Sequence, residues 1–195
     1  RDDLIKTGLF RQQSDGSIQD TFQGRIMFPY LNRGKVAYFI GRETDQTPEW
    51  EKERRMKYSK LLVHGDKHAY VSEQVRNNYF YGEDEIRGQD TIFITEGVTD
   101  CIIANQHGFP CVSPLTTSFR DDDHPKLIEL TKHATDIFIV NDNEANEAGR
   151  NGAFRTAGAL WAAGKVARFI ELPRPEGLNK VDLNDFLRQF GADEF

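Results

Sequence analysis

Strand-like and helix-like segments alternate along the second half of the chain, and this alternation restricts the fold more than any other feature. Two runs rich in β-branched and aromatic residues, TIFITE at 91–96 and TDIFIVND at 135–142, are typical of buried strands. A helical segment follows each run, GVTDCIIANQHG at 97–108 and EAGRNGAFRTAGALWAAG at 147–164. Strands joined through helices by short connections form parallel sheets covered by helices. We therefore predict an α/β fold for this half of the chain.

Three further segments extend the series. They are a short strand, PCVS at 110–113, a helix, DHPKLIELTKH at 123–133, with Pro125 near its start, and a closing strand, KVARFIEL at 165–172. Glycines close the first and the last helix of the series, at Gly108 and Gly164.

The first half of the chain has a different pattern. Residues 24–42, GRIMFPYLNRGKVAYFIGR, contain two stretches rich in Val, Ile, Phe and Tyr around a turn signal at 31–34, which predicts a β-hairpin. The polar segment at 43–58 is typical of a loop or a short helix. We predict two domains, a smaller mixed α+β subdomain of basic character at 1–88 and an α/β subdomain at 89–195.

Composition and charge narrow the class of protein. The formal net charge of −6 argues against a uniformly basic nucleic-acid-binding surface, but it suits an enzyme whose acidic and basic groups lie in separate regions. The sequence has no apolar run near the ~20 residues of a membrane span and no signal-peptide pattern, so we expect a cytoplasmic protein that does not bind membranes. Cys101 and Cys111 lack the spacing of a zinc site and are expected in the core.

Carboxylates follow two of the predicted strands at the points where these strands end. Glu96 closes one strand, Asp142 closes another, and Glu144 comes two residues later. Ligands of open parallel sheets bind beyond the carboxyl ends of the strands, and Asp100 in the next helical turn lies near the same edge. Carboxylates gathered at one edge repel each other unless a cation lies between them, so we predict a site for Mg²⁺ or Mn²⁺. Two simpler roles stay open, because Asp100 can favour a helix N-terminus and Glu144 can be a solvated loop residue.

The order of these motifs resembles a known family. ITEGVTD at 94–100, VNDNE at 140–144 and the helix start AGR at 148–150 are similar to the Toprim domain of bacterial-type primases, topoisomerases and certain nucleases. The upstream motifs resemble the RNA polymerase domain of bacterial-type DNA primase, the DnaG type; they are FQGRIMFP at 22–29, FIGR at 39–42, KY at 57–58 and YFYGED at 79–84. The resemblance spans residues 8–190 and implies a Toprim-like parallel sheet with flanking helices.

The resemblance implies roles for the acidic residues. The Toprim glutamate, a catalytic residue of the family, falls on Glu96, and the aspartate of the same motif falls on Asp100. The DxD motif falls on Asp142 and Glu144, which completes the predicted catalytic set. The AGR helix start comes later than in the family, so Glu144 with Asn146 is an alternative pair; we favour Asp142, because it directly follows the apolar strand.

A last acidic motif lies near the end of the chain. VDLNDFL at 181–187 resembles the family's final acidic motif and adds Asp182 to the predicted metal ligands. Asp182, with Asp185 three residues later, also predicts the N-cap of a helix. The sequence leaves both roles open.

The upstream resemblance implies a basic groove that binds nucleic acid or nucleotide. Its residues are Arg25, Asn32, Arg42, Lys57 and Arg76. Guanidinium groups suit phosphates, which agrees with this role for the arginines, but each cation can also be a simple surface charge. The SPLTTSF segment at 113–119 can offer hydroxyls to a phosphate or form a satisfied polar loop.

The resemblance predicts an enzyme, the catalytic domain of a DNA primase. Such a DNA-directed RNA polymerase is a nucleotidyltransferase that joins nucleoside triphosphates into short RNA primers on single-stranded DNA, and a replicative helicase, fused or separate, is its expected partner. One alternative is a Toprim nuclease, which would lack the basic upstream half. A second is a non-catalytic nucleic-acid-binding replication module. A topoisomerase would need a catalytic tyrosine, whereas Tyr79 and Tyr81 lie in a hydrophobic stretch typical of packing.

Overall fold

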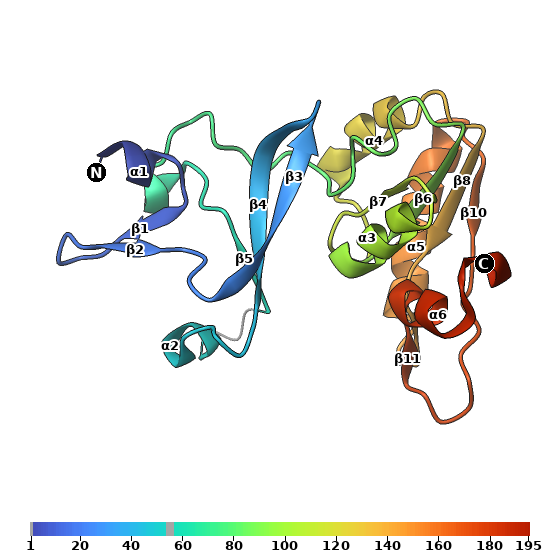
Figure 1. Ribbon diagram of the computed structural model, residues 1–195. Helices are drawn as coiled ribbons and strands as arrows, with labels where there is room; N and C mark the ends of the chain where they lie inside the picture. Colours follow the sequence, from blue (N-terminus) through green and yellow to red (C-terminus); the bar gives the residue numbers. More distant parts are fainter. Residues whose placement is uncertain (1, 54–56) are drawn as a thin grey trace. The chain divides into compact units, whose positions relative to one another are not determined.

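The structure, a computed structural model, describes residues 2–53 and 57–195 and divides into two compact units, Arg1–Tyr79 and Phe80–Phe195 (Figure 1). We refer to them as unit 1 and unit 2. The domain boundary predicted at residue 88 falls inside unit 2, because Phe80 and Ile86 belong to the hydrophobic core of that unit.

Unit 1 is built around an antiparallel sheet of three strands in the order β3-β4-β5, with β3 at Arg25–Asn32, β4 at Lys35–Glu43 and β5 at Tyr58–Lys60. The first two strands form the predicted hairpin. Its two turn residues, Arg33 and Gly34, have φ of 53° and 72°. Positive φ at both central residues matches the twist of a two-residue hairpin, which explains the glycine at the second position.

Short elements surround this sheet. Strands β1 (Phe10–Gln12) and β2 (Ile18–Asp20) pair antiparallel after helix α1 (Asp2–Lys6), and helix α2 (Glu49–Lys52) follows the hairpin. The polar segment predicted as a loop or short helix at 43–58 therefore contains one helical turn, while residues 54–56 of that segment lie outside the described residues. A 3₁₀ turn at Asp66–His68 lies in the connection toward unit 2.

Unit 2 contains a parallel sheet of four strands in the order β10-β8-β6-β7, which confirms the predicted α/β class. The strands are β6 at Thr91–Thr95, β7 at Cys111–Val112, β8 at Asp136–Val140 and β10 at Ala167–Phe169. The closing strand is shorter than the predicted 165–172, because β10 is an edge strand that pairs with β8 over three residues only.

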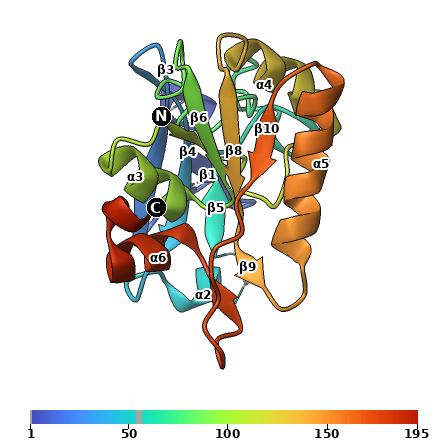
Figure 2. The ribbon, with the colours of Figure 1, turned by 90° about the vertical axis from the view of Figure 1, so that its right-hand side faces the viewer.

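Both faces of this sheet are covered by helices (Figure 2). On one face, Ile92, Ile94, Ile137 and Ile139 pack in a core with residues of α4 (His124–Leu130) and α5 (Ala148–Ala162). On the other face, Phe93 packs with residues of α3 (Val98–Gln106) and α6 (Leu183–Phe190). Successive strand residues point to opposite faces, so the continuous apolar runs serve two cores at once.

Glycines end two of these helices as predicted. Gly108 and Gly164, with φ of 82° and 75°, lie just beyond the last residues of α3 and α5, where a left-handed residue stops a helix. The remaining elements are 3₁₀ turns at Asp121–Asp123 and Ala192–Glu194 and a two-stranded sheet formed by β9 (Asn143–Glu144) and β11 (Lys180–Val181). Within the described ranges, no helix combines the length and the apolar character that crossing a membrane requires.

Candidate metal centre

Two neighbouring strands of unit 2 bring the first carboxylates together. Strands β6 and β8 pair parallel from Thr91↔Asp136 to Thr95↔Val140. Glu96 follows β6 directly, and Asp142 comes two residues after β8. In-register parallel strands end at the same edge of the sheet, so the backbone itself places these two acidic residues at one edge.

Five carboxylates meet at this edge, and we call them the acidic cluster: Glu96, Asp100, Asp142, Glu144 and Asp182. They form two groups of three, Glu96 with Asp142 and Glu144, and Asp100 with Asp142 and Asp182. Within each group, one oxygen per residue lies within 4.8 Å of the others. Asp142 belongs to both groups. This arrangement is suited to one or two divalent cations, because hard cations take several carboxylate oxygens at such spacing.

Glu96 is partly buried, and its surroundings disfavour its charged form. Its Oε2 atom is buried and makes no hydrogen bond within the described part of the chain. Partial burial, and next the charge of Asp142, raise the pKa of Glu96 to about 7 from the ordinary 4.5. A buried and unbonded carboxylate oxygen is costly, so this atom fits a metal ligand.

The other buried members respond in the same way. Burial and the charge of Asp182 raise the pKa of Asp100 to about 6, although Asp100 Oδ1 accepts a hydrogen bond from the Asn184 amide at 3.0 Å. Burial likewise raises the pKa of Asp142. Each carboxyl therefore holds its proton more tightly than in water, and a cation that favours the charged form would reverse the shift.

Asp100 and Asp182 also support helix α6. Asp182 is the N-cap of this helix and accepts a hydrogen bond from the Asp185 amide at 2.8 Å, as expected from the spacing of the two residues. Asp100 accepts a hydrogen bond from the amide of Asn184, so it also caps the N-terminus of α6. Two of the four unpaired amides at the start of α6 are thus satisfied by members of the acidic cluster.

Lys180 is a site residue that was not predicted from the sequence. Its Nζ forms an ion pair with Asp142 Oδ2 and lies 3.5 Å from Glu144 Oε1. The antiparallel pairing of β11 with β9 sets Lys180 opposite Glu144. Although partial burial acts in the other direction, the hydrogen bond to Asp142 and the charges of Asp142, Glu144 and Glu96 raise the pKa of Lys180. The one signal in the sequence was its position two residues before Asp182.

The turn after Asp142 distinguishes the two residue pairs that could form the DxD motif, Asp142 with Glu144 and Glu144 with Asn146. Glu144 lies in β9 with its carboxylate in the cluster, whereas Asn146 is exposed and its Oδ1 accepts a hydrogen bond from the Ala148 amide at 2.9 Å. The residues between Glu144 and the AGR start connect β9 to α5. The geometry therefore favours Asp142 with Glu144 over the pair that includes Asn146.

Neutral residues hold this edge in shape. Asn141 is buried, and its Nδ2 donates to the carbonyls of Thr117 and Gly149 at 2.7 and 2.9 Å. A Cβ atom at Gly149 would lie 2.2 Å from the Asp142 carbonyl oxygen, so glycine is needed where α5 approaches the cluster. The Ser113 hydroxyl donates to the Glu96 carbonyl at 2.8 Å. The SPLTTSF segment thus supports the site through hydrogen bonds to its backbone and to Asn141.

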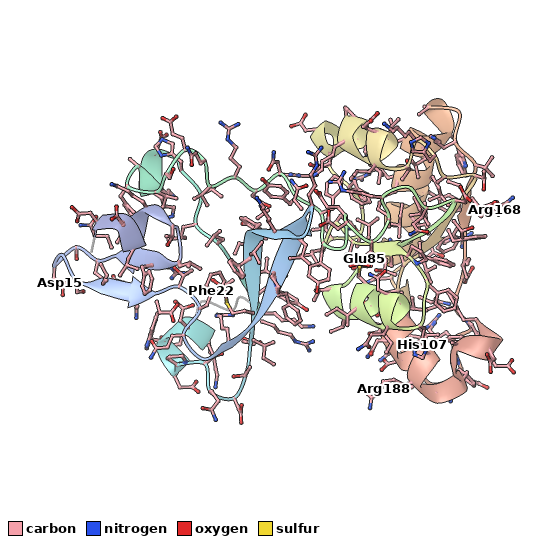
Figure 3. All side chains as sticks on the ribbon, turned by 45° about the horizontal axis from the view of Figure 1, so that its top comes forward. Asp15, Phe22, Glu85, His107, Arg168 and Arg188 are labelled. Atoms are coloured by element: carbon pink, nitrogen blue, oxygen red, sulfur yellow. The ribbon has the colours of Figure 1, made fainter. Side chains whose placement is uncertain are left out.

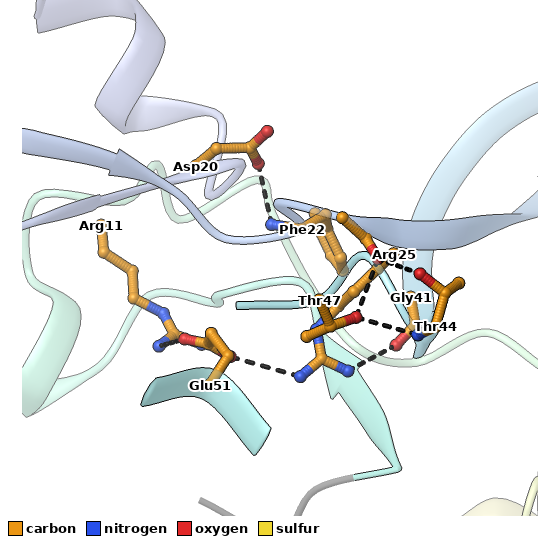
Figure 4. Close-up of polar contacts among 9 residues, drawn as sticks. Arg11, Asp20, Phe22, Arg25, Gly41, Thr44, Thr47 and Glu51 are labelled. Atoms are coloured by element: carbon orange, nitrogen blue, oxygen red, sulfur yellow. Dashed lines mark hydrogen bonds and ion pairs between the residues drawn. The ribbon is translucent and has the colours of Figure 1, made fainter. Parts of the chain in front are cut away.

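The basic residues predicted upstream lie in unit 1, in different environments. Arg25 is buried, and its guanidinium forms an ion pair with Glu51 Oε2 at 3.3 Å and bonds the Gly41 carbonyl at 3.4 Å (Figure 4). Arg11 binds the other Glu51 oxygen at 3.0 Å. This network gives Arg25 a structural role inside unit 1, and its predicted contact with nucleic acid stays a prediction.

The other four predicted residues are better exposed. Arg42 lies in β4 opposite Tyr58, and Lys57, which precedes Tyr58 in the chain, is exposed. Asn32 lies at the turn end of the hairpin, away from Arg42. Arg76 is exposed and donates through Nε to the Glu73 carbonyl at 3.1 Å. The strand pairing therefore places Arg42 and Lys57 in the same part of unit 1, at the far end of the hairpin from Asn32.

Comparison with known proteins agrees with this picture. The sequence profile of the Toprim domain matches residues 91–193. A protein named DNA primase from Legionella pneumophila is 30% identical over 202 residues, which cover 99% of this chain and 31% of the relative. The chain thus spans about three tenths of the length of that relative, and the resemblance noted from the motifs is confirmed.

Solved structures show the same fold. The Aquifex aeolicus primase, solved with its zinc-binding and RNA polymerase domains, has a TM-score of 0.71 at 23% identity, covering 97% of this chain and 43% of that one. A DnaG primase catalytic domain bound to single-stranded DNA has a TM-score of 0.69 at 24% identity, covering 98% of this chain and 57% of that one. Both cover unit 1 as well as unit 2, so the smaller unit also has the fold of these neighbours.

Proposed function

The chain belongs to the Toprim domain family, and from that premise we propose that it is the catalytic part of a DNA primase, which joins nucleoside triphosphates into a short RNA primer on single-stranded DNA. The observation that carries this proposal is the presence of two groups of three carboxylates, both of which include Asp142, at the edge of the sheet. Relatives named DNA primase match both units of the chain, which favours synthesis of RNA over the nuclease and the non-catalytic alternatives.

Mg²⁺ or Mn²⁺ is the proposed cofactor, and Glu96, Asp142 and Glu144 are its proposed catalytic ligands. The unbonded Oε2 of Glu96 and the raised pKa of Glu96 and Asp142 support this fit. When bound, such ions lower the pKa of the attacking 3′-hydroxyl and offset charge on the transferred phosphate. Asp100 and Asp182 are proposed to complete the set while they hold α6 in place.

Lys180 has a distinct proposed role in this site. Its ammonium group holds Asp142 and Glu144 close together through ion pairs. About half of its side chain is exposed, so Lys180 can move toward solvent. This movement loses only ion pairs that contribute little stability, because they are partly exposed. We expect Lys180 to keep the carboxylates in position before the cation arrives.

The DNA template and the triphosphate are proposed to meet the cations of unit 1. Arg42, Lys57 and Arg76 are not fully buried, so they can reach phosphate groups, and Asn32 can bond a base or a sugar. Binding through such contacts weakens steeply as salt is added. From the family resemblance, we also propose that the protein acts in the cytoplasm and that its partner is a replicative helicase, either fused to it or separate.

The decisive experiment measures incorporation of labelled ribonucleotides on single-stranded DNA with Mg²⁺ or Mn²⁺. The wild type is compared with Glu96→Gln and with the control Glu129→Gln, an exposed residue of α4 that pairs with Lys132. Short products from the wild type and the control, with none from Glu96→Gln, would support a metal-dependent primase. Degradation of the template that depends on Glu96 would instead identify a nuclease. The absence of both reactions, together with intact DNA binding, would favour a non-catalytic module.

A further inference from the structure

Exposed apolar side chains gather on α5 and beside β10 in unit 2, where Figure 2 shows the helix next to the strand. Phe154, Trp161 and Val166 are 44%, 50% and 51% exposed. The ring centroids of Phe154 and Phe169 lie 5.8 Å apart, and Trp161 Nε1 donates to the Ala167 carbonyl at 2.9 Å. Large apolar side chains grouped on a surface are typical of a site where another molecule binds. We call this region the α5–β10 surface.

A glycine lies between the two aromatic residues of α5. Phe154, Gly158 and Trp161 are four and three residues apart, so they form one stripe along the helix. Glycine destabilises a helix interior relative to alanine. At Gly149 and Gly152 it is required, because a Cβ atom there would lie 2.2 Å from a backbone oxygen, whereas a Cβ atom at Gly158 would meet no described atom within 4 Å. Gly158 therefore leaves a gap between two rings that the fold itself does not need.

The outer edge of β10 has backbone groups that remain available. Toward β8, the Val166 carbonyl accepts from the Ile137 amide at 3.1 Å, and the Ile170 amide donates to a β8 carbonyl at 2.9 Å. Alternate residues of a parallel edge strand direct their groups the other way, so those of Ala167 and Phe169 face outward. Trp161 satisfies the Ala167 carbonyl. The two amides and the Phe169 carbonyl have no partner in the described part of the chain, and such an edge can accept a further strand.

The charge of this surface is positive, although the chain as a whole carries −6. Helix α5 contains two arginines and no acidic residue. Arg150 lies 3.6 Å from Glu147, and Arg155 is exposed and forms no ion pair with any described residue. Arg168 of β10 pairs with Asp136 in a partly exposed contact. Exposed pairs contribute little stability, so three guanidinium groups can turn toward an acidic ligand.

We propose that the α5–β10 surface binds an extended acidic segment of a partner protein, which adds a strand to β10. Successive side chains of an added strand point to opposite faces. A large apolar side chain enters the gap over Gly158 between Phe154 and Trp161, and acidic side chains contact Arg155 and Arg168. Because β10 has only three residues, the apolar anchor supplies most of the affinity. The inference goes beyond the proposed function and does not depend on it.

Two other occupants agree less well with these observations. A second copy of this chain would bring two surfaces of the same charge together, and like charges repel across an interface. Single-stranded nucleic acid uses arginines and aromatic rings, but it has no backbone amides and carbonyls to pair with a strand edge. The ring of Phe154 is also in contact with Phe169 and lies 5.7 Å from the Arg150 guanidinium, so it is not a free stacking platform.

The test selects peptides from a phage-displayed random library on the immobilised full chain. Fluorescence anisotropy then measures their Kd for the wild type, Gly158→Glu, Arg155→Glu and the control Gln106→Glu, which adds the same charge at an exposed residue of α3. We expect peptides rich in Asp and Glu with one large apolar residue. Their Kd should rise roughly tenfold or more in both surface variants and less than about twofold in the control. Gly158→Glu should melt no lower than the wild type, because glutamate favours a helix more than glycine does.

The other outcomes would overturn the inference. They are a selection that yields no specific peptide, peptides without acidic residues, and peptides that bind the folded Gly158→Glu and Arg155→Glu variants as tightly as the wild type. Loss of single-stranded DNA binding in these variants with unchanged peptide binding would assign the surface to nucleic acid. A wild-type dimer, measured by analytical ultracentrifugation, that Gly158→Glu dissociates would assign it to a second copy. If Gly158→Glu does not fold, Arg155→Glu decides the test alone.

Discussion

One site in unit 1 and one site in unit 2 treat buried carboxylates in opposite ways. In unit 1, the buried carboxylate of Glu51 is matched by two guanidinium groups, those of Arg25 and Arg11 (Figure 4). In unit 2, five carboxylates gather at one edge of the sheet, and Lys180, whose side chain is half exposed, pairs with two of them. The first arrangement is balanced within the protein, whereas the second is not.

The imbalance is local to one edge of unit 2. The same unit buries Glu83 completely and pairs it with Arg87 and Lys126, as unit 1 does with Glu51. The fold therefore has the means to neutralise a buried carboxylate where structure requires it. A group of carboxylates that the protein does not neutralise with its own cations is typical of a site that binds a cation from solution.

The largest expected effect comes from Asp142, because it belongs to both groups of three. Asp142→Asn is expected to lower nucleotide incorporation by roughly 100-fold or more, since both groups lose a charged ligand. The measurement is the initial rate of incorporation across a Mn²⁺ titration. Asp136→Asn, at the other end of the same strand, serves as the control, because Asp136 forms an exposed ion pair with Arg168. Figure 3 shows Arg168 at the surface of unit 2. A variant that keeps a tenth of the wild-type rate would contradict the role of Asp142.

The next effect is on stability and concerns unit 1. Glu51→Gln leaves the buried Arg25 without its negative partner, so the free energy of unfolding should fall by about 3 kcal/mol. Urea unfolding of the full chain, followed by circular dichroism, measures the loss. Glu49→Gln in the same helix is the control, because Glu49 is exposed and its pair with Lys52 contributes less than about 1 kcal/mol. If the two variants lowered the free energy of unfolding equally, the buried pair of Glu51 with Arg25 would be no more important than a surface pair.

A smaller effect with the opposite sign is expected at Glu96 in the metal-free protein. Its pKa is about 7 in the folded state and ordinarily 4.5, so the unfolded chain loses this proton first as the pH rises. Stability contributed by Glu96 is therefore complete below about pH 4.5 and falls as the pH rises to about 7. Because the group is partly exposed, Glu96→Gln should recover only on the order of 1 kcal/mol at pH 8.

Thermal unfolding in EDTA at pH 5 and pH 8 tests this sign. The gain in melting temperature of Glu96→Gln over the wild type should be larger at pH 8, while Glu129→Gln, at an exposed carboxyl paired with Lys132, should show no such gain. A variant less stable than the wild type at pH 8 would mean that the acidic cluster is balanced after all.

The smallest expected effect belongs to Lys180. Lys180→Met removes the cation between Asp142 and Glu144, so the metal-free protein should lose about 0.5 to 1 kcal/mol. Saturating Mn²⁺ should restore most of this loss, because the metal supplies the missing charge. Urea unfolding with and without Mn²⁺ measures both values, and a loss that Mn²⁺ leaves unchanged would show that Lys180 acts through packing alone.

The parts of the site that could be predicted are those set by local pattern. Glu96 and Asp142 follow apolar runs, and parallel strands bring such ends together, so their proximity follows from the order of elements. Lys180 could not be found in this way, because β9 and β11 are two-residue strands without periodicity that pair across more than thirty residues. Their pairing depends on tertiary packing of unit 2.

Arg25 shows the same limit in unit 1. At the start of a strand rich in aromatic residues, an arginine resembles a surface cation, and its burial depends on Glu51 from a helix 26 residues later. The hairpin itself was predictable, because the turn residues and the flanking strands are local signals. Partners distant in sequence decide whether a charge is buried, and the pattern around one residue does not contain them.

The hydrogen bond from the Asn184 amide to Asp100 has a consequence for biosynthesis. These residues are 84 positions apart, and Asp100 and Asp182 both support the start of α6. At roughly 5–20 residues per second, a ribosome needs several seconds to add the intervening segment after it has added Asp100. During that time the second group of three carboxylates is incomplete, so the nascent chain cannot bring all five carboxylates together until α6 has been made.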